Sequence, residues 1–143
     1  MDIQQNTEIT NATSMRFASP SVLRRVEKTI WITFALPGIH RYPDAPEEVA
    51  YLRELHRHMF HFKVGMTVAH SNREVEFHML KNWCVGLYKE GTLQLDYKSC
   101  EMMAEDLLTK LADEYGNDRV LSVEVSEDQE CGAIVTWSPA NIR

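Results

Sequence analysis

The sequence predicts an α+β domain with the element order ββααββ, in which a four-stranded antiparallel sheet carries two helices on one face. Two observations support this class. Apolar residues alternate with polar ones in four segments, as in half-buried strands. Between the second and third of these, two longer segments place apolar residues at helical spacing. The length of 143 residues fits a single domain over 25–143, preceded by a polar, flexible N-terminal extension over 1–24.

The first strand is expected at 28–36, where β-branched and aromatic residues dominate. Pro37-Gly38 is expected to interrupt it. The two prolines of 41–46 indicate a loop, and 47–55 has the composition of a helical turn. The chain should therefore leave the first strand before His40 and return to the sheet after a loop.

The second strand is expected over 56–69. Its even positions from Phe60 to Val68 are apolar, and His56 and His58 lie at the end of that same face. Residues two apart in a strand project to the same side. We therefore expect both imidazoles to point to the buried side of the sheet.

Two helices are expected at 75–89 and from Ser99 to Gly116. Each has an apolar stripe at helical spacing, Ser99 suits an N-cap, and Gly116 suits a C-terminal stop. Residues 93–97 are expected to be a short connection between them. The helices should cover the apolar face of the sheet.

The chain should end in a hairpin, with strands at 119–127 and 133–137 and a turn at 128–132. Glu127 has the parity of the buried positions on its strand. Because a buried carboxylate without a partner is costly, we expect a ligand or a set of N–H donors beside it.

Composition excludes several classes of protein. A formal charge of −6 and the lack of a basic run argue against nucleic-acid binding. No apolar window is long enough for a membrane span, and the N-terminus lacks a signal pattern, so we expect a cytoplasmic protein. Cys84, Cys100 and Cys131 are odd in number and widely spaced, which favours reduced thiols.

The histidines provide the clearest candidate site. His56 and His58 share one face, and His40 lies on the preceding segment. Three neutral imidazoles with one open position are typical of catalytic zinc. The spacing alone leaves open that they are ordinary core or surface histidines. We expect His61 and His78 to be ordinary, because they lie on other faces or elements.

Six short segments, in this order and on these elements, resemble motifs of the 6-pyruvoyltetrahydropterin synthase and 6-carboxytetrahydropterin synthase family. These are the tunnelling-fold enzymes of pterin and 7-deazaguanine synthesis, and the resemblance spans about residues 29–137. The segments are His40-Arg41, Leu55-His56-Arg57-His58-Met59-Phe60, Val75-Glu76-Phe77-His78-Met79-Leu80-Lys81, Leu95-Asp96-Tyr97, Ser99-Cys100-Glu101 and Val125-Ser126-Glu127.

The resemblance implies a zinc site, a substrate site and an assembly. The implied zinc ligands are His40, His56 and His58, and the implied substrate-binding residues are Glu127, Glu101 and Ser99. Glu127 would accept two N–H bonds from the amino-pyrimidine edge of a pterin or purine-like ligand. The implied assembly is a homohexamer of two stacked trimeric barrels, with active sites between subunits.

The sequence departs from the family pattern at the proton-transfer groups. Leu52 stands where the family has a catalytic cysteine, and Tyr97 stands where it has a histidine. Leucine cannot abstract a proton, so another group would have to do so. The candidates are Asp96, which also suits a structural place before the second helix, and Glu54, Glu48, Tyr97, Cys100 and Cys131.

Three functions remain open at this point. The first is a zinc-dependent lyase acting on 7,8-dihydroneopterin triphosphate or a related pterin, including a role in queuosine-type 7-deazaguanine synthesis. The second is a non-catalytic, zinc-containing homologue that binds a pterin or purine. The third is an oligomer with purely structural zinc, in which a fourth protein ligand would close the metal site.

Overall fold

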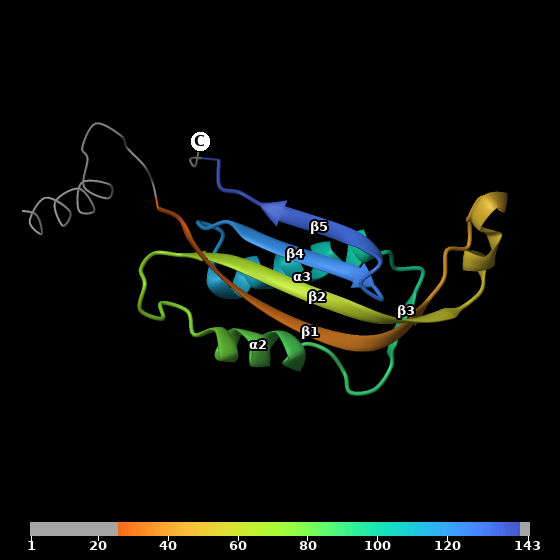
Figure 1. The fold of residues 1–143 in the computed structure, drawn as a ribbon, viewed down its shortest axis with the longest axis horizontal. Coiled ribbons are helices and arrows are strands. Elements are labelled where there is room, and N and C mark those ends of the chain that lie inside the picture. The colour runs from red at the N-terminus through yellow and green to blue at the C-terminus, as the bar shows by residue number, and fades with distance from the viewer. Residues whose placement is uncertain (1–25, 141–143) are drawn as a thin grey trace, which may run out of the picture.

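The computed structural model describes residues 26–140, which form one mixed five-stranded sheet and three helices (Figure 1). The predicted extension at 1–24 lies outside the described residues. In chain order the elements are β1 (Lys28–His40), the 3-10 helix η1 (Glu47–Arg53), β2 (His56–Val68), α2 (Phe77–Gly86), β3 (Leu93–Asp96), α3 (Cys100–Tyr115), β4 (Leu121–Glu127) and β5 (Cys131–Trp137).

The sheet has the strand order β3-β1-β2-β4-β5. The α+β class is confirmed, but the prediction of four antiparallel strands is wrong. Residues 93–97, expected to be a connection, contain β3, which pairs in parallel with the end of β1. Four residues give too short an alternation to predict a strand from the sequence, and β3 is recognised only by its pairing with the edge of β1.

The first strand is longer than predicted. β1 continues through Pro37-Gly38 to His40, and the pairing with β2 runs without interruption to His40 opposite His56. At Pro37 the strand has a neighbour on one side only, because β3 pairs from Gly38 onward. A proline, which has no N–H to donate, is tolerated where a strand has a free edge.

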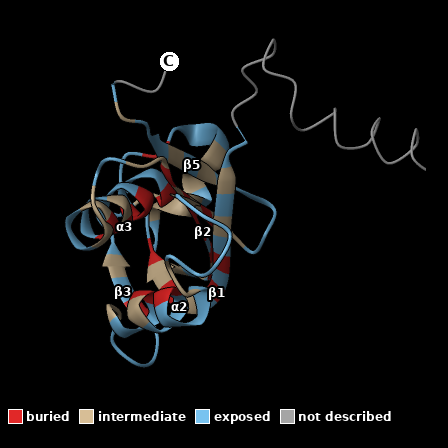
Figure 2. Ribbon diagram, turned by 90° about the vertical axis from the view of Figure 1, so that its left-hand side faces the viewer, coloured by how far each residue is buried: buried red, intermediate tan, exposed pale blue. Residues whose placement is uncertain are grey.

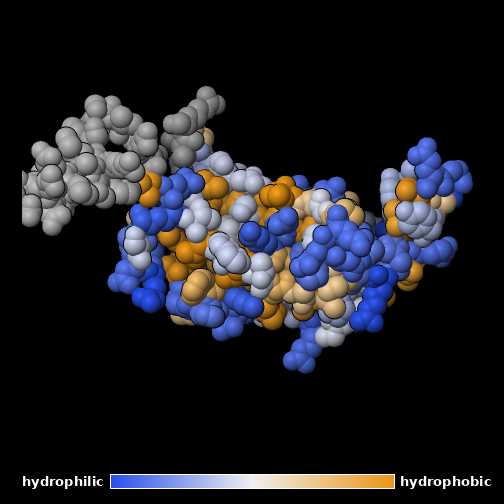
Figure 3. Space-filling view, viewed as in Figure 1, coloured by the Kyte–Doolittle hydropathy of each residue, from blue (hydrophilic) through white to orange (hydrophobic). Residues whose placement is uncertain are grey.

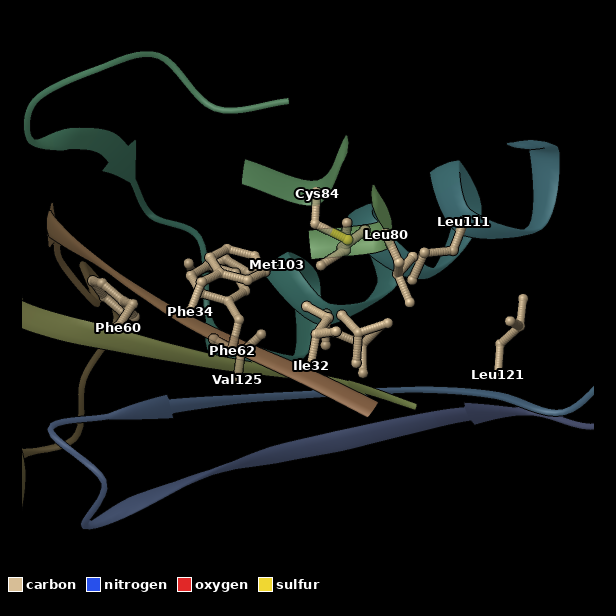
Figure 4. Close-up of a cluster of buried hydrophobic side chains, with 14 of the residues drawn as sticks. Ile32, Phe34, Phe60, Phe62, Leu80, Cys84, Met103, Leu111, Leu121 and Val125 are labelled. Carbon is tan, nitrogen blue, oxygen red and sulfur yellow. The ribbon is translucent and has the colours of Figure 1, made fainter. Parts of the chain in front are cut away.

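The hydrophobic core lies between the helices and one face of the sheet (Figure 2). The alternation predicted for the second strand is confirmed, since its even residues from Phe60 to Met66 are fully buried. Figure 4 shows Phe34 and Phe62 of adjacent strands beside Met103 of α3. None of the helices within 26–140 combines the length and apolar character needed to cross a membrane.

Both predicted helices are present, with small changes at their ends. α2 is shorter than the predicted 75–89 at both ends, and it starts at Phe77 because Glu76 caps it by accepting a hydrogen bond from the Met79 N–H. α3 begins after Ser99, whose hydroxyl accepts from the Met102 N–H as predicted. The final hairpin is tighter than predicted, since β5 begins at Cys131.

Candidate metal centre

The continuous β1–β2 ladder brings the three predicted histidines together. His40 ends β1 and pairs with His56 at the start of β2, and His58 projects from the same face two residues later. One ring nitrogen from each lies within 4.8 Å of the others. These strand ends share one end of the sheet with β3 and the β4–β5 turn (Figure 1).

Each imidazole is held by a hydrogen bond from its Nδ1 atom to an oxygen that can only accept. His40 donates to the Lys98 carbonyl at 2.8 Å, and His56 donates to the Glu54 carbonyl at 2.8 Å. His58 donates to the Asp128 carboxylate at 2.7 Å. These contacts place the proton of each neutral ring on Nδ1 and leave Nε2 with a free lone pair. Such outer contacts are typical of metal-binding histidines.

Glu127 faces two of these nitrogens from the end of β4. Its Oε1 lies 3.2 Å from His40 Nε2, and its Oε2 lies 3.4 Å from His58 Nε2. His58 Nε2 is buried and has no hydrogen-bond partner. Lone pairs on nitrogen and oxygen repel at these distances unless a proton or a metal ion lies between them. The residues present therefore fit a divalent cation.

Asp128 positions His58, a role that was not predicted from the sequence. Its Oδ1 accepts from the Met59 N–H at 2.9 Å while its Oδ2 holds His58. These two hydrogen bonds, the backbone one first, lower the pKa of the Asp128 carboxyl. Asp128 has a φ of 53°, a left-handed conformation that aspartate tolerates. An acidic residue at the predicted turn was the available signal, but its partner 70 residues away was not visible in the sequence.

A cavity of about 670 Å³ opens beside the histidines. This volume lies in the range of small-molecule sites. Most of the residues singled out from the sequence line it. They are His40, Leu52, His56, Tyr97, Ser99, Cys100, Glu101, Glu127 and Cys131. The side chains expected to bind a substrate thus face the same space as two of the three imidazoles.

Two of the proton-transfer candidates, Asp96 and Glu54, lie outside the cavity. Asp96 is exposed at the end of β3, and its Oδ1 accepts from Arg41 Nε at 2.9 Å. Glu54 is exposed as well, and it contributes only its backbone carbonyl to the site. Neither residue lines the cavity, whereas Leu52 and Tyr97 do.

The two thiols of the cavity differ in environment. Cys100 is buried, and its Sγ lies 4.0 Å from Glu127 Oε1. Burial, and then the nearby Glu127 carboxylate, raise the pKa of the Cys100 thiol to about 12, so it stays protonated at neutral pH. Cys131 is exposed and pairs with Glu127 across the hairpin.

Comparison with solved structures identifies a similar fold. The structure of Caenorhabditis elegans 6-pyruvoyl tetrahydropterin synthase superposes with a TM-score of 0.56, covering 83% of this chain and 100% of that chain. The two sequences are 14% identical, so the similarity shows the fold alone. No family model and no curated protein matches the sequence. The chain therefore has an α+β fold like that of the pterin synthase.

Proposed function

We propose that this protein is a zinc-dependent lyase of the 6-pyruvoyltetrahydropterin or 6-carboxytetrahydropterin synthase type. The observation that carries the proposal is the convergence of three Nδ1-anchored imidazoles, two of which, His40 and His56, line a cavity that Glu127 also lines. The substrate would be 7,8-dihydroneopterin triphosphate or a related pterin, including one used in queuosine-type synthesis. The free thiols support a cytoplasmic location.

The chain's own residues would bind and orient the pterin. Glu127 would accept two N–H groups of the amino-pyrimidine edge, and Ser99 and Glu101 would contact the ring from the start of α3. His40, His56 and His58 would hold zinc, which as a Lewis acid polarises a side-chain oxygen of the substrate. Tyr97, Cys100 and Cys131 line the cavity and each carries a proton that it can donate, so they are the remaining candidates for proton transfer.

The direct test is to incubate the zinc-loaded protein with 7,8-dihydroneopterin triphosphate and to separate the products by chromatography. We expect either 6-pyruvoyltetrahydropterin or 6-carboxytetrahydropterin, and the product identifies the reaction. The His56→Ala variant serves as the control for a metal-independent background. No product from a preparation with one zinc per chain would refute the lyase.

A non-catalytic pterin- or purine-binding protein is the second candidate function. It is favoured by the cavity wall, where Leu52 replaces a proton-transfer group and neither Asp96 nor Glu54 is present. In that case neopterin would bind to the zinc-loaded protein, and no substrate would turn over. Fluorescence titration with neopterin, done alongside the activity assay, separates this function from the lyase.

Self-association into a homohexamer is part of the proposal. The strand β5 lies at an edge of the sheet, and Trp31 of β1 and Ile134 of β5 are large apolar residues exposed on the surface. Figure 3 shows hydrophobic patches among hydrophilic residues on the face that it views. An unpaired edge and exposed large apolar side chains are features of association surfaces. Analytical ultracentrifugation should give about six times the 16.5 kDa mass of one chain.

Replacing Asp128 with asparagine should weaken zinc binding by about 10- to 100-fold, as expected for the loss of a partner that orients a metal-binding histidine. Asparagine keeps the size of the side chain but removes the negative charge that holds His58. Competition with a chromogenic chelator measures the affinity. Asp118→Asn, an exposed residue remote from the imidazoles, is the control, and equal affinities for both variants would contradict the assigned role.

A further inference from the structure

The carboxylate of Glu127 lies directly beside two of the three candidate metal ligands. Its two carboxylate oxygens lie 3.2 Å and 3.4 Å from the Nε2 atoms of His40 and His58. In a tetrahedral zinc site with metal–ligand distances of 2.0–2.2 Å, neighbouring ligand atoms are separated by about 3.3 Å. Each of these two N···O separations is therefore the distance expected between neighbouring atoms that bind the same ion.

The hydrogen bonds of His40 and His58 also favour a metal ion between these two rings and Glu127. The Nδ1 atoms of His40 and His58 donate to the Lys98 carbonyl and to Asp128, so in the neutral rings both Nε2 atoms present lone pairs to Glu127. His58 Nε2 is buried without a hydrogen-bond partner. A cation between the carboxylate and the imidazoles would satisfy all of these atoms at once.

We propose that Glu127 is the fourth protein ligand of the metal in the ligand-free protein and closes the coordination sphere formed by His40, His56 and His58. This inference rests on the metal site of the proposed function but not on its reaction. A carboxylate cannot fully serve the metal and a pterin at the same time. Glu127 is one-quarter exposed and lines the cavity, so a pterin held by this carboxylate would remove it from the metal and open the fourth position.

The test uses the full-length protein loaded with Co²⁺, whose visible absorption reports the number and type of ligands, and a chelator competition for Zn²⁺. Glu127→Gln should change the cobalt spectrum and weaken zinc binding at least tenfold, while Glu127→Asp, which keeps the carboxylate, should recover part of the affinity. The matched control is Glu124→Gln, on the opposite face of the same strand. Circular dichroism confirms that each variant is folded.

An unchanged cobalt spectrum and zinc affinity in Glu127→Gln would overturn the inference, whatever the activity of the protein. If the cobalt spectrum and the zinc affinity both change in Glu127→Gln, but the unmodified protein makes no pterin product, the result would support Glu127 as the fourth ligand and refute only the lyase. Should Glu127→Gln fail to fold, the Glu127→Asp spectrum decides. A shorter carboxylate on the metal must alter that spectrum, and an unaltered one overturns the inference.

Discussion

Replacing Phe60 with alanine should lower the free energy of unfolding by about 4 kcal/mol, the loss expected when a buried phenylalanine is removed from a packed core. Phe60 is completely buried on β2. Its ring lies edge-on to the imidazoles of His40 and His58, with centroid separations of 5.1 Å and 5.7 Å. A Cβ on Gly38 would meet this ring at 2.8 Å, so the ring fills the space left by that glycine.

The measurement is urea unfolding of the metal-free protein at a fixed protein concentration, because self-association would make stability depend on concentration. Phe60→Leu retains much of the side-chain volume and should lose less than half as much stability. The two variants separate the effect of the cavity from the effect of the aromatic ring. A loss below about 1 kcal/mol in Phe60→Ala would contradict the role assigned to the ring.

The β1–β2 pair shows how much of the fold the sequence predicted. The alternation over 56–69 correctly placed Phe60, His56 and His58 on the buried face, because a period of two depends only on local geometry. The extension of β1 through Pro37 was missed. Its tolerance of a proline depends on where β3 begins, which is a property of the tertiary structure.

The candidate metal centre also combines features predicted from local sequence patterns with features that depend on tertiary structure. The histidines and the parity of Glu127 were predicted from strand spacing and family resemblance. The atoms that hold the rings were not, since two of them are the backbone carbonyls of Lys98 and Glu54, to which any residue type would contribute equally. The approach of Glu127 to His40 joins β4 to β1, strands that do not pair with each other, so no sequence pattern records it.

Replacing His56 with alanine should weaken zinc binding more than 100-fold, because the loss of a metal ligand exceeds the 10- to 100-fold effect of losing an outer partner. His56 is the suitable histidine to remove. It is only half-buried, and its hydrogen bond goes to the Glu54 carbonyl in an exposed segment. The metal-free variant should therefore retain nearly all of the stability of the unmodified protein.

The measurement is the thermal unfolding temperature with and without zinc. A ligand at 100 times its dissociation constant stabilises the folded state by about 2.7 kcal/mol, so zinc should raise the unfolding temperature of the unmodified protein but not that of His56→Ala. His61→Ala is the matched control. His61 lies on the same strand and contacts Gln129 on the opposite face. A variant lacking His56 that zinc still stabilises to the full extent would mean that the metal is not held at the β1–β2 strand ends.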